Sequence, residues 1–215
     1  MSLTKLLENP RIWRGGSRLD TRTGLASGFA ELDRCLPGGG WPTEALTEIL
    51  VGHYGIGELR LLMPALARLS AEEAAPHYSE QAEPGWIAWV SPPFQPYAPA
   101  LQQCGIDLSR MLVVRPKDDS ELLWSAEQAL SSGTCAAVLL WPETLDDQAS
   151  RRLQLAAEKG HSWAIVFRPF SARHEPSAAA LRLALESTEQ GTRVHILKSR
   201  GGRPTVLNNL FRNKP

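Results

Sequence analysis

Short apolar segments alternate with segments of helical periodicity along most of the chain, and this alternation limits the possible folds more than any other feature. Cys135–Trp141 is a continuous apolar run, which is typical of a central parallel strand. In Glu58–Leu69, apolar residues recur at the spacings of three and four that mark one face of a helix. This alternation predicts an α/β fold in which a mostly parallel sheet carries helices on both faces.

The same reading predicts the individual elements. Strands are expected at Ala45–Val51, Trp86–Val90, Leu112–Val114, Cys135–Trp141, Ala164–Phe167, Arg193–Leu197 and Pro204–Leu207. Helices are expected at Gly28–Asp33, Glu58–Leu69, Tyr97–Cys104, Asp118–Leu130, Gln148–Lys159 and Ser177–Glu186. The last two strands would form an antiparallel hairpin around Gly201-Gly202.

Composition places the chain among ordinary globular proteins. It has 215 residues, 43% of them apolar, which is enough for a sizeable core and excludes wholesale disorder. The three cysteines show no spacing typical of a disulfide framework or a zinc site, as expected in a reducing cytoplasm. The sequence indicates no metal site, signal peptide or membrane-spanning segment, and we expect no membrane partner.

Charge is unevenly distributed although the formal net charge is zero. No acidic residue occurs from Gln190 to Pro215, and the basic residues of this stretch are Arg193, Lys198, Arg200, Arg203, Arg212 and Lys214. A basic end on an acidic body is typical of an interaction element, or of an ordinary solvated strand and tail. Zero net charge argues against a protein that binds nucleic acid unaided, because phosphate neutralisation supplies most non-specific affinity.

The stretch Glu48–Leu59 has the position and glycine spacing of a phosphate-binding loop, but not its chemistry. Gly52 and Gly57 match the two glycines of the G-x-x-x-x-G-K-[ST] pattern, with Gly55 between them. Glu58 stands where the lysine belongs, and Leu59 stands where a hydroxyl would bind magnesium. Glutamate repels phosphate and leucine cannot coordinate a metal ion. A degenerate loop is therefore expected, with no nucleotide cofactor.

Two further positions lack the carboxylates that nucleotide hydrolysis needs. The apolar run Cys135–Leu140 should end in a magnesium-orienting aspartate, but Trp141-Pro142 follow it. A catalytic carboxylate should follow Trp86–Val90, but Ser91-Pro92-Pro93 stand there. We therefore predict that the protein is not an enzyme and has no catalytic residues. A residual nucleotide-dependent enzyme with an unusual loop is the alternative.

Several segments, in their order along the chain, resemble the RecA family. They are Thr23–Asp33, Pro37–Pro42, Cys104–Leu112 and Ser132-Gly133. The resemblance covers about Gly24 to Pro204 and implies a RecA-like core with a degenerate P-loop. Within that superfamily the chain looks most like the ImuA proteins, which are RecA-like accessory factors of SOS-induced translesion synthesis. Phe167–Ala172 also resembles SulA, the SOS cell-division inhibitor.

The resemblance to ImuA implies a non-catalytic scaffold for damage-induced mutagenesis. The implied partners are an inactive Y-family polymerase relative of the ImuB type and possibly RecA, with a possible weak DNA contact through the basic end. A SulA-like inhibitor that binds the tubulin-like division protein is the alternative function.

We expect three regions: an N-terminal arm (1–23), a RecA-like core (24–197) and a basic C-terminal hairpin and tail (198–215). Lys198 and Arg200 fall where RecA has two lysines that contact a neighbouring subunit's ATP. Trp13 lies among arginines, a composition typical of an interface or of an arm packed on its own domain. The candidate partner-binding residues are Trp13, Arg168, Lys198, Arg200, Arg203, Arg212 and Lys214.

Overall fold

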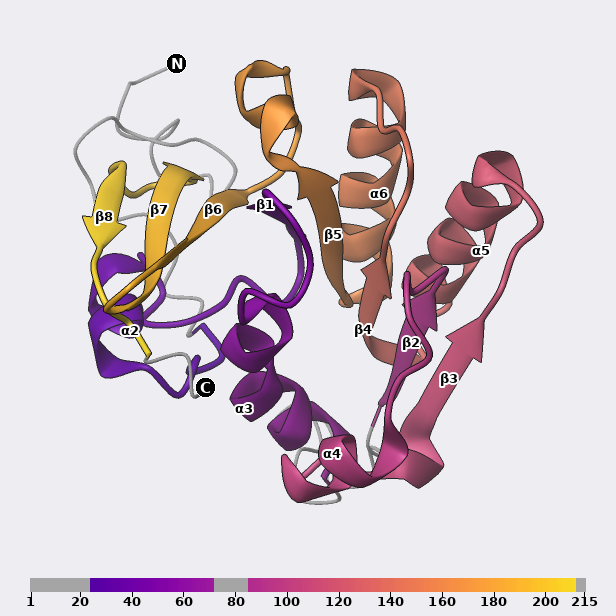
Figure 1. The fold of residues 1–215 in the computed structure, drawn as a ribbon. Coiled ribbons are helices and arrows are strands. Elements are labelled where there is room, and N and C mark those ends of the chain that lie inside the picture. The colour runs from indigo at the N-terminus through magenta and orange to yellow at the C-terminus, as the bar shows by residue number, and fades with distance from the viewer. Residues whose placement is uncertain (1–23, 72–84, 212–215) are drawn as a thin grey trace, which may run out of the picture.

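A computed structural model gives the fold of residues 24–71 and 85–211, the parts of the chain that the structure describes. Its centre is one eight-stranded mixed sheet in the order β3-β2-β4-β5-β1-β6-β7-β8 (Figure 1). The strands are β1 (Leu46–Val51), β2 (Trp86–Val90), β3 (Met111–Val114), β4 (Cys135–Leu140), β5 (Trp163–Pro169), β6 (Leu181–Thr188), β7 (Gly191–Ser199) and β8 (Thr205–Leu207).

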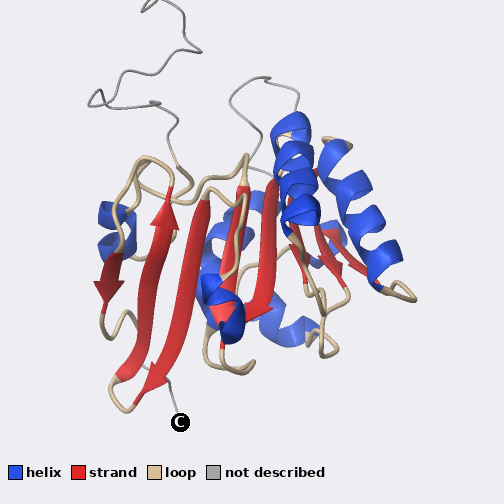
Figure 2. Ribbon diagram, turned by 90° about the horizontal axis from the view of Figure 1, so that it is seen from above, coloured by secondary structure: helices blue, strands red, loops and turns tan. Residues whose placement is uncertain are grey.

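Helices lie on both faces of this sheet, as the alternating sequence pattern predicts (Figure 2). The α-helices are α2 (Ala30–Cys35), α3 (Glu58–Ser70), α4 (Ala98–Gln103), α5 (Asp119–Ser131) and α6 (Asp147–Gly160). Two short 3₁₀ turns accompany them, η2 (Leu108–Arg110) and η3 (Phe170–His174). α2 and α3 pack on one face of the sheet, and α5 and α6 pack on the other.

Parallel pairing runs from β3 through β2, β4, β5 and β1 to β6. The remaining strands, β7 and β8, are antiparallel to their neighbours. The sheet is therefore only partly parallel, because antiparallel pairing extends beyond the expected hairpin and also joins β6 to β7. The mixed α/β sheet with flanking helices is confirmed, and the finer assignment to a RecA-like core stays a prediction.

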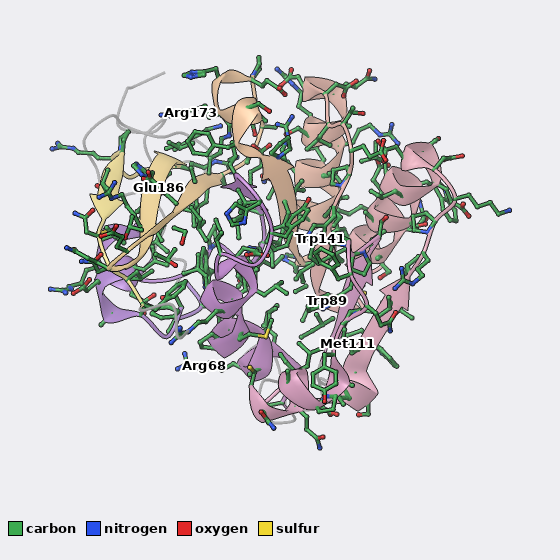
Figure 3. All side chains as sticks on the ribbon, viewed as in Figure 1. Arg68, Trp89, Met111, Trp141, Arg173 and Glu186 are labelled. Atoms are coloured by element: carbon green, nitrogen blue, oxygen red, sulfur yellow. The ribbon has the colours of Figure 1, made fainter. Side chains whose placement is uncertain are left out.

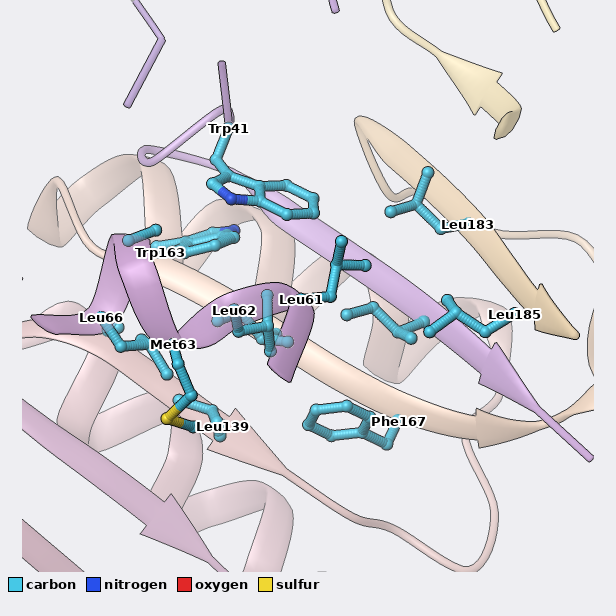
Figure 4. Close-up of a cluster of buried hydrophobic side chains, with 14 of the residues drawn as sticks. Trp41, Leu61, Leu62, Met63, Leu66, Leu139, Trp163, Phe167, Leu183 and Leu185 are labelled. Carbon is cyan, nitrogen blue, oxygen red and sulfur yellow. The ribbon is translucent and has the colours of Figure 1, made fainter. Parts of the chain in front are cut away.

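The core on the α3 face is built around tryptophans and the leucines of α3. Trp41 and Trp163 are fully buried, with ring centroids 5.2 Å apart (Figure 4). The indole N–H of Trp163 donates to the hydroxyl of Thr47 on β1 at 3.0 Å. This contact satisfies a polar atom that would otherwise be buried without a partner. Helix α3 continues through Pro64, and its buried side chains fill the space under the two indoles.

The segment Ser177–Glu186 is not a helix, and this prediction was wrong. Residues 175–180 cross the sheet face in extended form, and the chain then enters β6, which pairs with both β1 and β7. Leu181, Leu183 and Leu185 point to one face of the sheet and join the α3-side core. A period of two therefore underlies the apolar residues of β6, because alternate side chains of a strand point to opposite faces.

Most other predicted elements are confirmed within a few residues. The side chain of Asp118 caps α5 by accepting from the backbone N–H of Glu121 at 2.8 Å, which confirms the predicted helix start. The hairpin around Gly201-Gly202 is present as β7 and β8. β7 continues through Ser199, so Lys198 lies within a strand of the sheet. Residues 1–23, including Trp13, and residues 212–215, including Arg212 and Lys214, lie outside the described structure.

Candidate functional site

The loop between β1 and α3 is the first place to look for function, because ligands of open α/β sheets bind beyond the carboxyl ends of the strands. The loop has the backbone shape that its glycines suggest. Gly55 and Gly57 have φ angles of 91° and 104°, in the region that favours glycine. Gly57 directly precedes α3, and the loop therefore opens onto a helix N-terminus.

A side chain of the protein already occupies the anion position of this loop. Glu58 is only 5% exposed, and its two carboxylate oxygens accept from the backbone N–H of Gly55 at 2.8 and 3.1 Å. In a phosphate-binding loop such N–H groups would donate to a phosphate. Glu58 thus places negative charge where an anionic ligand would bind. It also occupies the N–H group of Gly55, which is then not available to such a ligand. Tyr54 lies nearby, and burial followed by the charge of Glu58 raises its pKa.

The C-terminal end of the described chain closes the other side of the loop. The ring of Phe211 lies so close to Gly57 that a Cβ atom there would be 2.5 Å from the ring. The hydroxyl of Thr192 donates to the carbonyl of Ile56 at 3.0 Å, and the backbone N–H of Thr192 donates to Phe211 at 3.0 Å. These contacts fix the loop from the direction of β7. The sequence alone gives no sign of the pairing between residues 57 and 211.

The two other positions where the sequence lacks an expected carboxylate are Trp141 and Ser91. Trp141 follows β4, is 7% exposed, and stacks on Phe167 with ring centroids 4.7 Å apart and planes at 8°. Its other neighbour is Trp89 at 5.5 Å; Figure 3 labels both tryptophans. Ser91 follows β2, and its backbone N–H donates to Val114 at the end of β3. An aromatic stack therefore follows β4, where the sequence comparison placed the expected magnesium-orienting aspartate.

No group of three or more His, Cys, Asp or Glu side chains in the described residues is arranged to hold a metal ion. None of the helices there is long and apolar enough to cross a membrane.

The predicted partner-binding residues fall into different environments. Arg168 was expected to contact a partner, and the structure corrects this. Its side chain is 5% exposed, it forms an ion pair with Glu175, and it donates to the carbonyl of Leu145 at 2.9 Å. It also lies 3.6 Å from Glu48. Arg168 therefore stabilises the interior and does not offer its charge at the surface.

Lys198, Arg200 and Arg203 are exposed at the end of β7 and in the following turn. Lys198 is partly used inside the protein, because its ammonium group donates to the carbonyl of Ser177 at 2.9 Å. Desolvation, followed by the charges of Arg182 and Arg200, lowers its pKa. Arg200 lies 3.6 Å from Glu158 of α6 and remains 63% exposed. Three of the seven predicted residues therefore lie close together in the chain at the end of β7. All three are exposed, and the side chain of Arg203 has no hydrogen bond or ion pair within the described residues.

The fold and this loop define a class of protein: a mixed α/β-sheet protein in which the glycine-rich loop between β1 and α3 is filled by the protein's own side chains. Comparison with known proteins makes the relationship specific. A family model described as cell division inhibitor SulA matches residues 59–164. Protein ImuA of Caulobacter vibrioides is 28% identical over 214 residues, covering 88% of this chain and 83% of that protein.

The SulA relatives match a shorter part of the chain. The cell division inhibitor SulA of Photorhabdus laumondii is 32% identical over 123 residues, which is 57% of this chain and 63% of that protein. The crystal structure of SulA from Pseudomonas aeruginosa covers 57% of this chain and 97% of its own, with 27% identity and a TM-score of 0.45. The chain is therefore similar to ImuA along most of its length and to SulA over a shorter stretch.

Magnesium ATP is expected to leave the melting temperature of this protein unchanged. A ligand at 100 times its dissociation constant adds about 2.7 kcal/mol of stability to the folded state, which is a shift of several degrees. Glu58 occupies the N–H donor of Gly55 and replaces the lysine that would contact the phosphates. Trp141 replaces the aspartate that would orient magnesium. Differential scanning fluorimetry with millimolar Mg-ATP measures the shift, and Mg-ADP serves as a second ligand. A clear upward shift would restore the nucleotide-dependent alternative.

Proposed function

We propose that this protein is a non-catalytic accessory factor of the SOS response that acts in damage-induced mutagenesis. Its role is to dock an inactive polymerase-like partner of the ImuB type, RecA, or both, during translesion synthesis in the cytoplasm. The observation that carries the proposal is the extent of similarity to ImuA. It spans 88% of the chain, whereas the SulA match of the family model is confined to residues 59–164.

The site supports docking over chemistry as the mechanism. Three positions where a nucleotide-hydrolysing protein would need a lysine or a carboxylate hold Glu58, Ser91 and Trp141. The side chains of Glu58 and Trp141 are engaged within the protein, and Ser91 has no carboxylate. A docking function would therefore use exposed surface residues. Arg200 and Arg203 supply exposed positive charge at the end of β7, and Arg212 and Lys214 follow in the sequence. A partner with an acidic surface fits this end, and weak contact with nucleic acid phosphate is the other proposed use.

The proposal is tested by capturing partners from cells after DNA damage. Truncation after Leu197 is a poor variant, because it removes β8 and the buried Phe211. The sharper variant is Arg200→Glu/Arg203→Glu, which reverses two exposed charges. We expect the wild-type chain to capture the ImuB-type protein or RecA, and the variant to capture at least about tenfold less, which corresponds to about 1.4 kcal/mol. Reversal of Lys117 and Lys159, which are also exposed, is the matched control.

A result in which neither partner appears with the wild-type chain would contradict the proposed function. If the Arg200→Glu/Arg203→Glu variant captures as much partner as the wild-type chain, the proposed function stands. The contact with the partner then lies outside the basic end. Direct contact with DNA is separable by its salt dependence, because phosphate contacts weaken steeply as salt rises.

A second candidate function is inhibition of cell division, which the SulA family match favours. In that case overproduction of the protein would make cells filament, and the captured partner would be the tubulin-like division protein. An accessory factor of mutagenesis would leave cell division normal, and its loss would lower the frequency of damage-induced mutations. Microscopy and mutation counts on the same strains therefore separate the two functions.

A further inference from the structure

A small hollow opens beside the degenerate loop, at the carboxyl ends of β2 and β4. It has a volume of about 260 Å³ and is lined by Tyr54, Ser91, Pro92, Pro93, Trp141, Pro142 and Glu143. Trp141 forms part of its wall and is held in place by the stack on Phe167. Ligand pockets for small molecules usually enclose about 300–1,000 Å³. This hollow is smaller and open, so it suits a single large side chain better than a nucleotide.

Exposed aromatic side chains occur in the hollow and in the chain segment that follows β2. Phe94 and Tyr97, in the connection between β2 and α4, are each 71% exposed. Tyr54, in the hollow itself, is 37% exposed, and its ring lies 6.5 Å from that of Phe94 in an edge-on arrangement. Single exposed apolar residues are common, but clustered aromatic rings beside a hollow are typical of an interface.

The rim of the hollow is acidic. Glu143 is exposed at its edge, and the carboxylate of Asp119 accepts from the backbone N–H groups of Glu143 and Thr144 at 3.4 and 3.2 Å. Arg115, after β3, donates to the side-chain carbonyl of Gln95 at 2.6 Å. Negative charge beside exposed aromatic rings favours a basic ligand, because arginine and lysine pair with carboxylates and also lie over aromatic faces.

We propose that this surface, defined by Tyr54, Phe94, Tyr97, Trp141 and Glu143 and called the aromatic surface below, docks a basic peptide segment of a partner protein. An apolar side chain of the segment fills the hollow, and arginine or lysine residues beside it contact Glu143 and the exposed rings. This inference rests on the proposed docking function and gives it a location. The surface lies at the carboxyl edge of the parallel strands, whereas the exposed basic residues lie at the end of β7. The two charged surfaces therefore fit segments of opposite charge.

The probe for this proposal is a short fluorescein-labelled peptide with one phenylalanine flanked on both sides by arginines. Fluorescence anisotropy with the full chain measures its affinity. The expected result is saturable binding by the wild-type chain, and about tenfold or greater loss in the Phe94→Ala/Tyr97→Ala variant. Because both side chains are largely exposed, their removal leaves the core intact. The matched control is Leu155→Ala/Val206→Ala, which removes two exposed apolar side chains elsewhere on the surface and should bind the peptide normally.

Charge provides a second readout. The Glu143→Lys variant is expected to bind several-fold more weakly at low salt, with a smaller difference at high salt, because exposed charges are screened. Glu31→Lys, an exposed reversal on α2, is its control. A peptide with alanine in place of phenylalanine, or glutamate in place of arginine, should lose most of the affinity.

The proposal is overturned if the wild-type chain fails to bind the peptide at about 1 mM. It is also overturned if the Phe94→Ala/Tyr97→Ala variant binds as wild type does, or if the glutamate peptide binds equally well. Failure of this docking site is distinguishable from failure of the proposed function. If the wild-type chain and the Phe94→Ala/Tyr97→Ala variant capture the ImuB-type protein or RecA equally, the function stands and the location is wrong.

Discussion

Replacing Glu48 by alanine is expected to lower the free energy of unfolding by about 3–5 kcal/mol, which is the cost of breaking a buried ion pair by removing one partner. Glu48 lies on the central strand β1 and is fully buried. It accepts from the side chain of Arg182 at 2.8 Å and from the hydroxyl of Ser177 at 2.6 Å. Arg168 lies 3.6 Å from it. The substitution would leave two buried arginines without their shared carboxylate.

The same network also explains the path of the chain before β6. The guanidinium group of Arg182 donates to the backbone carbonyls of Ala172, Arg173 and Glu175, at 2.9, 3.4 and 3.1 Å. These bonds hold η3 and the start of the segment that crosses the sheet face, and buried Ala179 packs in the core further along it. Removing Glu48 should therefore loosen this crossing as well as lower global stability. Hydrogen exchange of residues 172–180 should rise in the variant.

Urea unfolding followed by circular dichroism measures the effect of the Glu48→Ala substitution. Glu186→Ala is the matched control, because Glu186 lies on the next strand, is half exposed, and pairs with Arg193 and His195. Exposed ion pairs contribute about 0–1 kcal/mol, so this control should change stability little. The Glu48→Gln variant keeps the side chain's size and some hydrogen bonding, and should fall between the two. A loss below about 1 kcal/mol for Glu48→Ala would mean that the network does not stabilise the fold.

The error at β6 shows where sequence reasoning fails for this chain. The alanines and leucines of Ser177–Glu186 satisfy helical spacing, and Pro176 suits a helix start. The alternative period of two was present in Leu181, Leu183 and Leu185, with the charged Arg182 between them. Its counterion, Glu48, is more than a hundred residues away in the sequence. Tertiary pairing of this kind overrides local propensity and cannot be read from a single segment.

The glycine-rich loop between β1 and α3 was predictable from sequence, but the side-chain contact that fills it was not. The spacing of Gly52 and Gly57, together with Glu58 and Leu59, already indicated a loop without phosphate chemistry. That Glu58 turns back onto the N–H of Gly55 depends on side-chain geometry, which no spacing rule supplies. Trp41 is fully buried and forms an isolated bridge with Leu25, a pairing that no local sequence pattern indicates.

Replacing Phe211 by alanine is expected to lower the free energy of unfolding by about 3 kcal/mol, at the lower end of the range for buried phenylalanine. Phe211 is 6% exposed, its ring centroid lies 5.5 Å from that of Phe29, and the guanidinium group of Arg60 lies 5.0 Å above the ring. Thermal and urea unfolding measure the loss. Val206→Ala, at an exposed position of β8, is the control and should change stability by less than about 0.5 kcal/mol. A loss of similar size for both variants would contradict the packing of residue 211 against the loop.

A double-mutant cycle with Gly57 tests the contact itself. In the wild-type chain, Gly57→Ala forces a side chain into left-handed backbone geometry and also against the ring of Phe211, 2.5 Å away. Once Phe211 is alanine, only the backbone strain remains, at about 1–2 kcal/mol. The double variant should therefore lose less stability than the two single variants together. Additivity within about 0.5 kcal/mol would place Phe211 away from Gly57, since distant sites do not couple. A sub-additive result would show that the ring of Phe211 packs directly against this loop.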